Sequence, residues 1–267
     1  MSYVFDVNGW LKHTSKDDNS FDQFVINYIS EITKPTDKIK RGLAAIVVSA
    51  WIDPNLLTDI CDDFGWIETK DFLLEVPPSN KTAKRGEFGE ALTYELLEKM
   101  LGFRVPVRKL RYKVTRGQSL PGTDILALKL NGGSISEVCF IECKLRTILD
   151  YQAALDAYKQ LLGIRTQKYP DIVKFTASRL KESGDKLYDS FRTYMLKHVN
   201  SVQMESFRIT LIYDQSAWDK KVIERLGDYS ENNHLGNTYV DVISIEELKD
   251  LVDSVYGSIG IEEVIGD

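Results

Sequence analysis

The sequence predicts a mixed α/β fold, in which helices flank a mixed β-sheet behind a mainly helical N-terminal extension. Three observations lead to this prediction. A helical pattern covers residues 83–101, a hairpin pattern covers residues 124–145, and later segments alternate between strand and helix patterns. Units of this kind build a sheet with helices on its faces.

The N-terminal region shows helical spacing first. Apolar residues at that spacing predict a helix over residues 20–33, which ends before Pro35. Residues 42–52 are apolar on all sides, a pattern that fits a buried strand and a buried helix equally well. A short helix is expected over residues 53–64, followed by an extended segment over residues 66–76.

A stretch rich in proline and polar residues, at positions 76–82, is the best candidate for a linker. We therefore expect an accessory region over residues 1–80 and the functional domain over residues 81–267. The helix over residues 83–101 should end at Gly102.

The part of the chain after Gly102 is expected to be rich in β-structure. Residues 103–115 alternate between basic and apolar, and Pro121-Gly122 should form a turn. Strands over 124–130 and 136–145 should pair through the turn Asn131-Gly132-Gly133. The remaining elements are helices at about 150–163, 170–200, 216–226 and 245–256 and strands at 207–213 and 238–243.

Composition favours a cytoplasmic protein without a membrane-bound segment. The chain has 267 residues and 43% hydrophobic residues, and no apolar run reaches the roughly 18–20 residues that cross a bilayer. The N-terminus lacks the pattern of a secretory signal. The three cysteines, Cys61, Cys139 and Cys143, form no CxxC pair, and the three histidines show no ligand spacing. We expect reduced, buried thiols and no zinc site.

Charge is unevenly distributed along the chain. The net charge is −6, yet residues 81–116 contain ten basic and four acidic residues, whereas residues 228–267 contain ten acidic residues and one basic residue. The basic segment suits contact with a phosphate backbone, although a solvated basic face gives the same pattern. The residues expected to hold such a backbone are Lys84, Arg85, Arg108, Lys109, Arg111, Lys113 and Arg116.

Two charges lie two residues apart in an otherwise apolar strand. Glu142 and Lys144 share one face of that strand, because side chains alternate with a period of two. Burying a charge costs several kcal/mol unless it is paired, so the pair is either a structural ion pair or part of a site.

The hairpin adds a second carboxylate. If the strands fold back symmetrically about residue 133, Asp124 lies opposite Glu142, with the Cβ atoms about 4.5–5.5 Å apart. Two carboxylates at that distance repel unless a proton or a cation joins them, and Mg²⁺ prefers such oxygen ligands. The main-chain carbonyl of Cys143 can add a further ligand. A register slip of one residue would separate the carboxylates onto opposite faces.

A third acid is expected from the preceding helix. Glu87 and Glu90 are three residues apart and lie near one helix face. Acids in a first helical turn are also stabilised by the helix dipole, which is the alternative explanation for both residues.

Together these residues resemble the PD-(D/E)xK, or restriction-endonuclease-like, nuclease superfamily. The resemblance covers Gly86-x-x-x-Glu90 on a helix, Pro121-Gly-Thr-Asp124 opening one strand and Ile141-Glu142-Cys143-Lys144 on the next. It implies a nuclease in which Asp124 and Glu142 bind Mg²⁺ (or Mn²⁺), Glu90 helps to hold the metal or its water, and Lys144 orients the attacking water. Glu87 is the second choice for the helix acid. Gly-Thr-Asp stands where the superfamily usually has Pro-Asp.

Over its whole length the chain is also similar to the nuclease subunit of the Hachiman anti-phage defence system. That similarity implies DNA as the substrate and a helicase as the partner protein. The acidic body suggests that the partner meets a surface away from the basic segment. Two alternatives remain: a catalytically silent nuclease fold that binds nucleic acid or a partner, and an unrelated α/β protein in which Glu142 and Lys144 are structural. Some of these nucleases carry a helix Tyr and Gln near phosphates, and Tyr151-Gln152 and Tyr158-x-Gln160 match that pattern, but helix packing explains them more simply.

Overall fold

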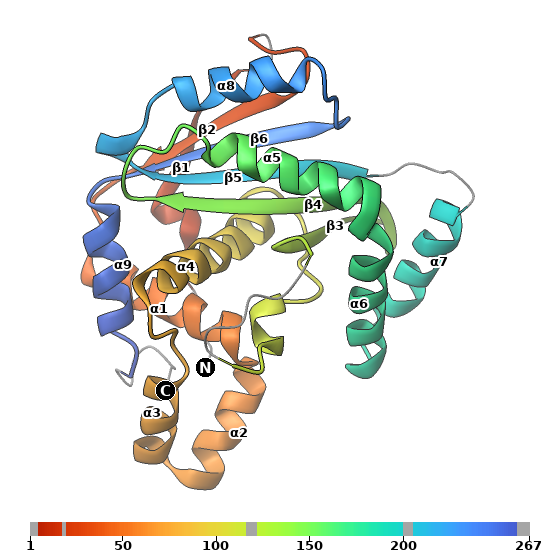
Figure 1. Cartoon of the computed structure of the whole chain (residues 1–267). Coiled ribbons are helices and arrows are strands. Elements are labelled where there is room, and N and C mark those ends of the chain that lie inside the picture. The colour runs from red at the N-terminus through yellow and green to blue at the C-terminus, as the bar shows by residue number, and fades with distance from the viewer. Residues whose placement is uncertain (1–4, 18–19, 116–121, 200–204, 261–267) are drawn as a thin grey trace.

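A mixed six-stranded β-sheet forms the centre of the protein (Figure 1). The computed structural model describes residues 5–17, 20–115, 122–199 and 205–260. In the sheet, β2, β6, β5 and β4 run parallel, and β1 and β3 pair antiparallel at the two edges. The strands are β1 (Leu11–Asp17), β2 (Val25–Glu31), β3 (Ile125–Asn131), β4 (Ser134–Arg146), β5 (Glu205–Asp214) and β6 (Thr238–Ile245). The mixed α/β fold predicted from the sequence is therefore confirmed.

Helices cover both faces of this sheet. Helices α1, α4 and α9 lie on one face and α5 and α8 on the other, while the pairs α2–α3 and α6–α7 project from the body (Figure 1). The helices are α1 (Asp37–Trp51), α2 (Pro54–Phe64), α3 (Trp66–Glu75), α4 (Lys81–Glu95), α5 (Ala153–Gly163), α6 (Tyr169–Glu182), α7 (Leu187–Val199), α8 (Lys221–Ser230) and α9 (Leu248–Gly257). Short helical turns are η1 (Val7–Gly9), η2 (Leu96–Met100), η3 (Lys109–Tyr112), η4 (Ile164–Lys168) and η5 (Gln215–Ala217).

The prediction of a helix over residues 20–33 is wrong, because this segment contains strand β2. β2 lies between β1 and β6, and its backbone pairs with both, so long-range pairing overrides the local helical spacing. β1 and β2 therefore extend the same sheet as the later strands. Residues 5–80 contribute to both hydrophobic cores together with the later elements, so the expected boundary at residue 80 separates neither two sheets nor two cores.

Two further segments differ from expectation or resolve an open choice. Residues 66–76, expected to be extended, form helix α3, which packs against α2 and buries Thr69 and Leu73 four residues apart. Residues 42–52 belong to helix α1, the buried-helix alternative. The expected helices over residues 53–64 and 83–101 are confirmed by α2 and by α4 with its π-helical continuation η2.

The segment over residues 103–115 is not a regular strand. Arg104 forms a single antiparallel bridge with Leu128, and the 3₁₀ turn η3 follows. Pro106 cannot donate a ladder hydrogen bond, which accounts for the early end of pairing. Gly122 has a positive φ of 99°, as a turn requires, whereas Pro121 lies outside the described residues.

Strand β4 separates the two cores. Cys139, Ile141 and Leu145 pack in the core that contains α1 and α4, whereas Val138 and Phe140 pack in the core that contains α5. Since side chains alternate along a strand, Glu142 and Lys144 lie on the α5 side.

No single helix in the described ranges is long and apolar enough to cross a bilayer. Helices α1 and α2 reach the required length and composition only as a pair, and a bend of 93° separates them.

Candidate active site on the β3–β4 hairpin

Asp124 directly precedes β3 and lies next to Glu142 on β4. The ladder pairs Ile125 with Ile141, so the next position outward places Asp124 opposite Glu142, in the register predicted from the sequence. The backbone N–H of Cys143 donates a hydrogen bond of 2.9 Å to Asp124 Oδ2. The Thr123 hydroxyl donates to the Ile141 carbonyl at 2.7 Å. These two bonds hold the start of β3 against β4.

Glu142 is a buried carboxyl with an ammonium group and a carboxylate as neighbours. Lys144 Nζ lies 3.5 Å from Glu142 Oε2, and Glu142 is only 2% exposed. Burial and the negative charge of Asp124 raise the pKa of Glu142 to about 8, although Lys144 acts in the opposite direction. Without a cation, the carboxyl of Glu142 therefore holds a proton near neutral pH.

Glu90 reaches the same region from helix α4. The close approach of α4 depends on Gly89, because a Cβ there would lie 3.1 Å from Cys143 Sγ and 3.4 Å from Leu145 Cβ. Burial and the charge of Asp124 raise the pKa of Glu90 well above its usual value. The charge of Asp124 therefore acts on both carboxyl groups.

Glu87 is engaged elsewhere. Its carboxylate accepts a hydrogen bond of 2.6 Å from Trp51 Nε1 and forms an ion pair with Lys113. Glu87 therefore connects α4 to α1 and to the segment after η3, and the geometry favours Glu90 as the helix acid.

Lys144 also contacts helix α5. Its Nζ donates a hydrogen bond of 2.8 Å to Gln160 Oε1. Helix packing alone does not explain Gln160, because its side chain accepts this hydrogen bond from Lys144. Tyr158 fits that explanation better: it is fully buried, and its hydroxyl donates to the Asn233 carbonyl at 2.8 Å.

Two residues near the carboxylates were not assigned there from the sequence. Lys109 Nζ donates to the Thr123 carbonyl at 2.7 Å, and its charge lowers the pKa of both Glu90 and Glu142. Tyr94 is fully buried, and burial together with the charge of Glu90 raises its pKa. The signal for Tyr94 was its place four residues after Glu90, on the same helix face. Lys109 carried no such signal, since only the fold brings η3 to the hairpin.

The donors fit a magnesium ion held by two carboxylates. Within the described residues, no group of three or more His, Cys, Asp or Glu side chains is arranged to hold a metal. Mg²⁺, however, is commonly bound through one or two carboxylates together with water and phosphate oxygens. Asp124 and Glu142 supply such a pair, and a cation bound there would replace the proton that Glu142 otherwise holds. The Cys143 carbonyl projects toward the same edge of β4 as its N–H, which binds Asp124.

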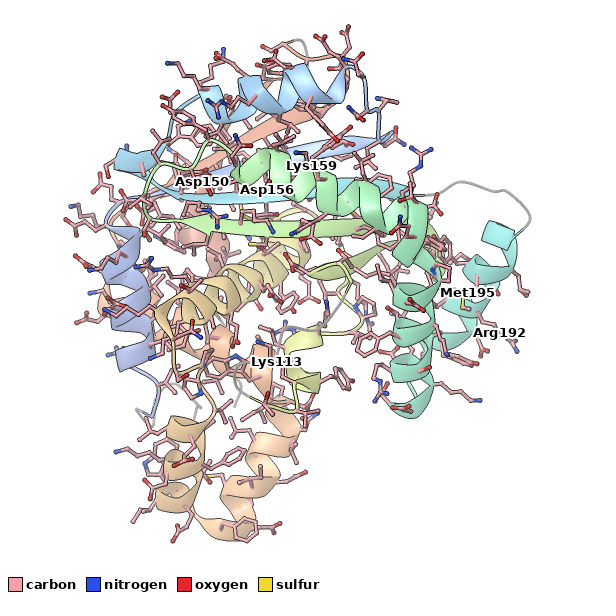
Figure 2. The ribbon with its side chains drawn as sticks, viewed as in Figure 1. Lys113, Asp150, Asp156, Lys159, Arg192 and Met195 are labelled. Atoms are coloured by element: carbon pink, nitrogen blue, oxygen red, sulfur yellow. The ribbon has the colours of Figure 1, made fainter. Side chains whose placement is uncertain are left out.

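The basic residues expected to hold phosphates fall into two groups. Arg108 pairs with Glu95 and Glu98 at 3.3 and 3.2 Å, Arg111 with Asp53 at 2.5 Å, and Lys113 with Glu87. Carboxylates of the protein itself therefore pair with all three cations. Figure 2 shows Lys113 on the side of the sheet that carries α1 to α4.

The second group lies at the start of helix α4. Lys84 lies over the Tyr256 ring at 5.1 Å, and Arg85 is partly exposed on the same helix. Arg116 lies outside the described residues.

Comparison with known proteins gives a family. No curated protein matches the chain. The sequence model of the HamA family matches residues 6–259, nearly the whole chain. The match agrees with the whole-chain similarity noted from the sequence, and the chain therefore belongs to the HamA family of the Hachiman anti-phage defence system.

Proposed function

We propose that this protein is a magnesium-dependent DNA nuclease of the PD-(D/E)xK type, with Mn²⁺ as a substitute metal. The observation that carries the proposal is the placement of Asp124 beside Glu142, with Lys144 on the same strand face as Glu142. Membership of the HamA family supports a role in anti-phage defence.

Each residue has a distinct part in this proposal. Asp124, Glu142 and the Cys143 carbonyl hold the cation, and Glu90 holds the metal or a water bound to it. Bound magnesium polarises the phosphate and lowers the pKa of a bound water. Lys144 places its ammonium group beside the incoming oxygen and stabilises the charge that develops in the transition state. Gln160 holds the Lys144 ammonium group in position through their 2.8 Å hydrogen bond.

We further propose that the protein is the effector subunit of a cytoplasmic defence complex with a helicase. The net charge of −6 opposes nonspecific binding to DNA, since long-range repulsion acts against a local basic patch. A partner that is already bound to DNA would raise the local concentration of substrate.

A cleavage assay tests the catalytic proposal. Linear, supercoiled and single-stranded DNA are incubated with the protein in Mg²⁺ or in EDTA, with and without the helicase subunit. We expect cleavage by the wild type in Mg²⁺ and none by Glu142→Ala, with both proteins showing cooperative melting curves.

A catalytically silent nuclease fold is the second candidate. The internal ion pairs of Arg108, Arg111 and Lys113 favour it, because they leave fewer cations for phosphate. Binding of DNA or of the helicase without cleavage of any of the three substrates would establish this alternative and overturn the nuclease proposal.

A further inference from the structure

The α2–α3 helix pair concentrates exposed apolar side chains. Eleven large hydrophobic residues are exposed in the described part of the chain, and five of them lie within the 22 residues from Pro54 to Glu75. Single exposed apolar residues are normal on a protein surface, whereas a cluster indicates an interaction site. The five are Leu56, Phe64, Ile67, Phe72 and Leu74, with Phe64 at 65% and Ile67 at 70% exposure.

The pair projects from the body and leaves one side uncovered (Figure 1). The helix pair buries the side chains of Leu57 and Leu73 in the hydrophobic core of the protein. On α2, Leu56 and Phe64 are eight residues apart and therefore share a helix face. Phe64 and Ile67 flank the turn at Gly65, whose φ of 86° reverses the chain. The exposed apolar surface therefore extends along α2 to the tip of the pair.

Charge determines which occupant suits this surface. Residues 54–75 contain six acidic residues and one basic residue, a net charge of −5. Nucleic acid and anionic membranes are disfavoured by this charge. A second copy of the chain is disfavoured as well, because a symmetric dimer through this surface would bring two acidic rims together. A protein groove with an apolar floor and a rim of Lys and Arg is complementary in both respects.

One side of α3 lines a pocket next to helix α4, the helix that carries Glu90. Asp71, Phe72 and Glu75 of α3 line a pocket of about 690 Å³ together with Glu87 and Lys113. At the base of the pair, Asp53 binds Arg111. A partner seated on α2–α3 would therefore stand beside Glu87 and Lys113, whose charges act on Glu90.

We propose that the α2–α3 pair is the docking element for a protein partner whose apolar groove is rimmed by basic side chains. This rests on the part of the proposed function that gives the protein a partner subunit, and it is independent of whether the chain cleaves DNA. The apolar ridge from Leu56 to Ile67 enters the groove, and the acidic residues meet its rim.

The experiment measures binding of the full-length protein to the helicase subunit of the same Hachiman system. The first variant, Phe64→Ser/Ile67→Ser, removes the apolar tip, and the second, Asp62→Lys/Asp63→Lys, reverses the rim charge. Leu196→Ser on α7 is the matched control, because Leu196 is 63% exposed outside the pair. We expect both double variants to raise Kd at least tenfold and the control to stay within twofold. Added NaCl should weaken wild-type binding.

Several results would overturn the docking proposal. One is binding of both double variants with wild-type affinity, and another is no binding by the wild type. A third is dimerisation of the wild type that the Phe64→Ser/Ile67→Ser change abolishes. The fourth is flotation of the wild type with lipid vesicles that the same change abolishes. Melting curves verify that each variant is folded. Failure of the nuclease proposal is read separately, from cleavage by Glu142→Ala, a substitution outside the docking surface.

Discussion

Asp124 lies opposite Glu142 one position beyond the Ile125–Ile141 pair, so its partly exposed carboxylate lies next to the buried carboxyl group of Glu142. The negative charge of Asp124 and the surrounding protein raise the pKa of Glu142 to about 8. At neutral pH the pair therefore retains a proton, and a divalent cation can take the place of that proton.

Stability without metal should fall as pH rises. The pKa of Glu142 is raised on folding from 4.5 to about 8, so between these values the folded state binds more protons than the unfolded state. The free energy of unfolding therefore decreases with pH in this window, by at most about 1.4 kcal/mol per pH unit for one proton. Thermal melting in EDTA from pH 5 to pH 8 measures the slope, and Glu142→Gln should reduce it to the part that Glu90 contributes.

Magnesium should stabilise the protein more at pH 8 than at pH 5.5. At the lower pH, protons compete with the cation for Glu142, whereas at the higher pH the cation meets less competition. The measurement is the rise in Tm on adding Mg²⁺ at each pH. An equal rise in the Glu142→Gln protein would show that Mg²⁺ binds elsewhere.

Replacement of Lys144 should remove cleavage while preserving the fold. Loss of one group that stabilises the transition state typically costs about 10²–10³ in rate. Lys144→Ala is compared with Lys129→Ala, which removes another hairpin lysine paired to a glutamate, Glu137, at 3.5 Å. We expect the Lys129 variant to cleave at the wild-type rate. Equal rates for the two variants would remove Lys144 from the site.

Gln160 should act on cleavage through Lys144. Its hydrogen bond to the ammonium group is partly solvated, so Gln160→Ala should reduce the cleavage rate by about tenfold, which corresponds to about 1.4 kcal/mol. Gln152→Ala is the matched control, because Gln152 is exposed at the start of the same helix. In the Lys144→Ala background the Gln160 change should have no further effect, and an additive loss would show that Gln160 acts independently.

Two glycines of helix α4 should respond differently to alanine. At Gly86 nothing lies within 4 Å of an added Cβ, so Gly86→Ala should stabilise the protein by about 0.5–1 kcal/mol. At Gly89 the added Cβ would crowd Cys143 and Leu145, which offsets that gain and displaces Glu90. Denaturant unfolding and cleavage assays should rank Gly89→Ala below Gly86→Ala in both stability and activity. The opposite ranking would show that neither stability nor activity depends on the close approach of α4 to β4.

Arginines of the basic segment should separate into structural and DNA-binding residues. Arg108 is half-buried between Glu95 and Glu98, so Arg108→Ala should chiefly lower Tm. Arg85→Ala should leave Tm unchanged, weaken DNA binding and reduce its salt dependence by about one counterion. Binding titrations of catalytically inactive Glu142→Ala protein at two salt concentrations measure this. An unchanged affinity for Arg85→Ala would exclude Arg85 from the DNA interface.

Local patterns were sufficient for the centre of the candidate site. The turn Gly132-Gly133 closes the hairpin, one residue shorter than the expected turn because Asn131 pairs with Ser134, and the period of two along β4 places Glu142 and Lys144 on one face. The hairpin contains an irregularity between Lys129 and Leu130, yet the pairing nearer the site keeps the expected register. A local turn and a local alternation are encoded within a few residues of each other, which is why the sequence alone determined them.

Contacts between distant segments required the tertiary structure. Strand β2 has helical spacing but gains backbone partners on both sides in the sheet. Glu87 is held by Trp51, 36 residues earlier, and Lys144 meets Gln160 only because α5 folds back over β4. Such pairings depend on which surfaces bury the most apolar area together. The local spacing of apolar residues in the sequence does not determine which surfaces these are. The sequence by itself therefore determined the carboxylate pair and its lysine, whereas the tertiary structure decided which neighbours hold them in place.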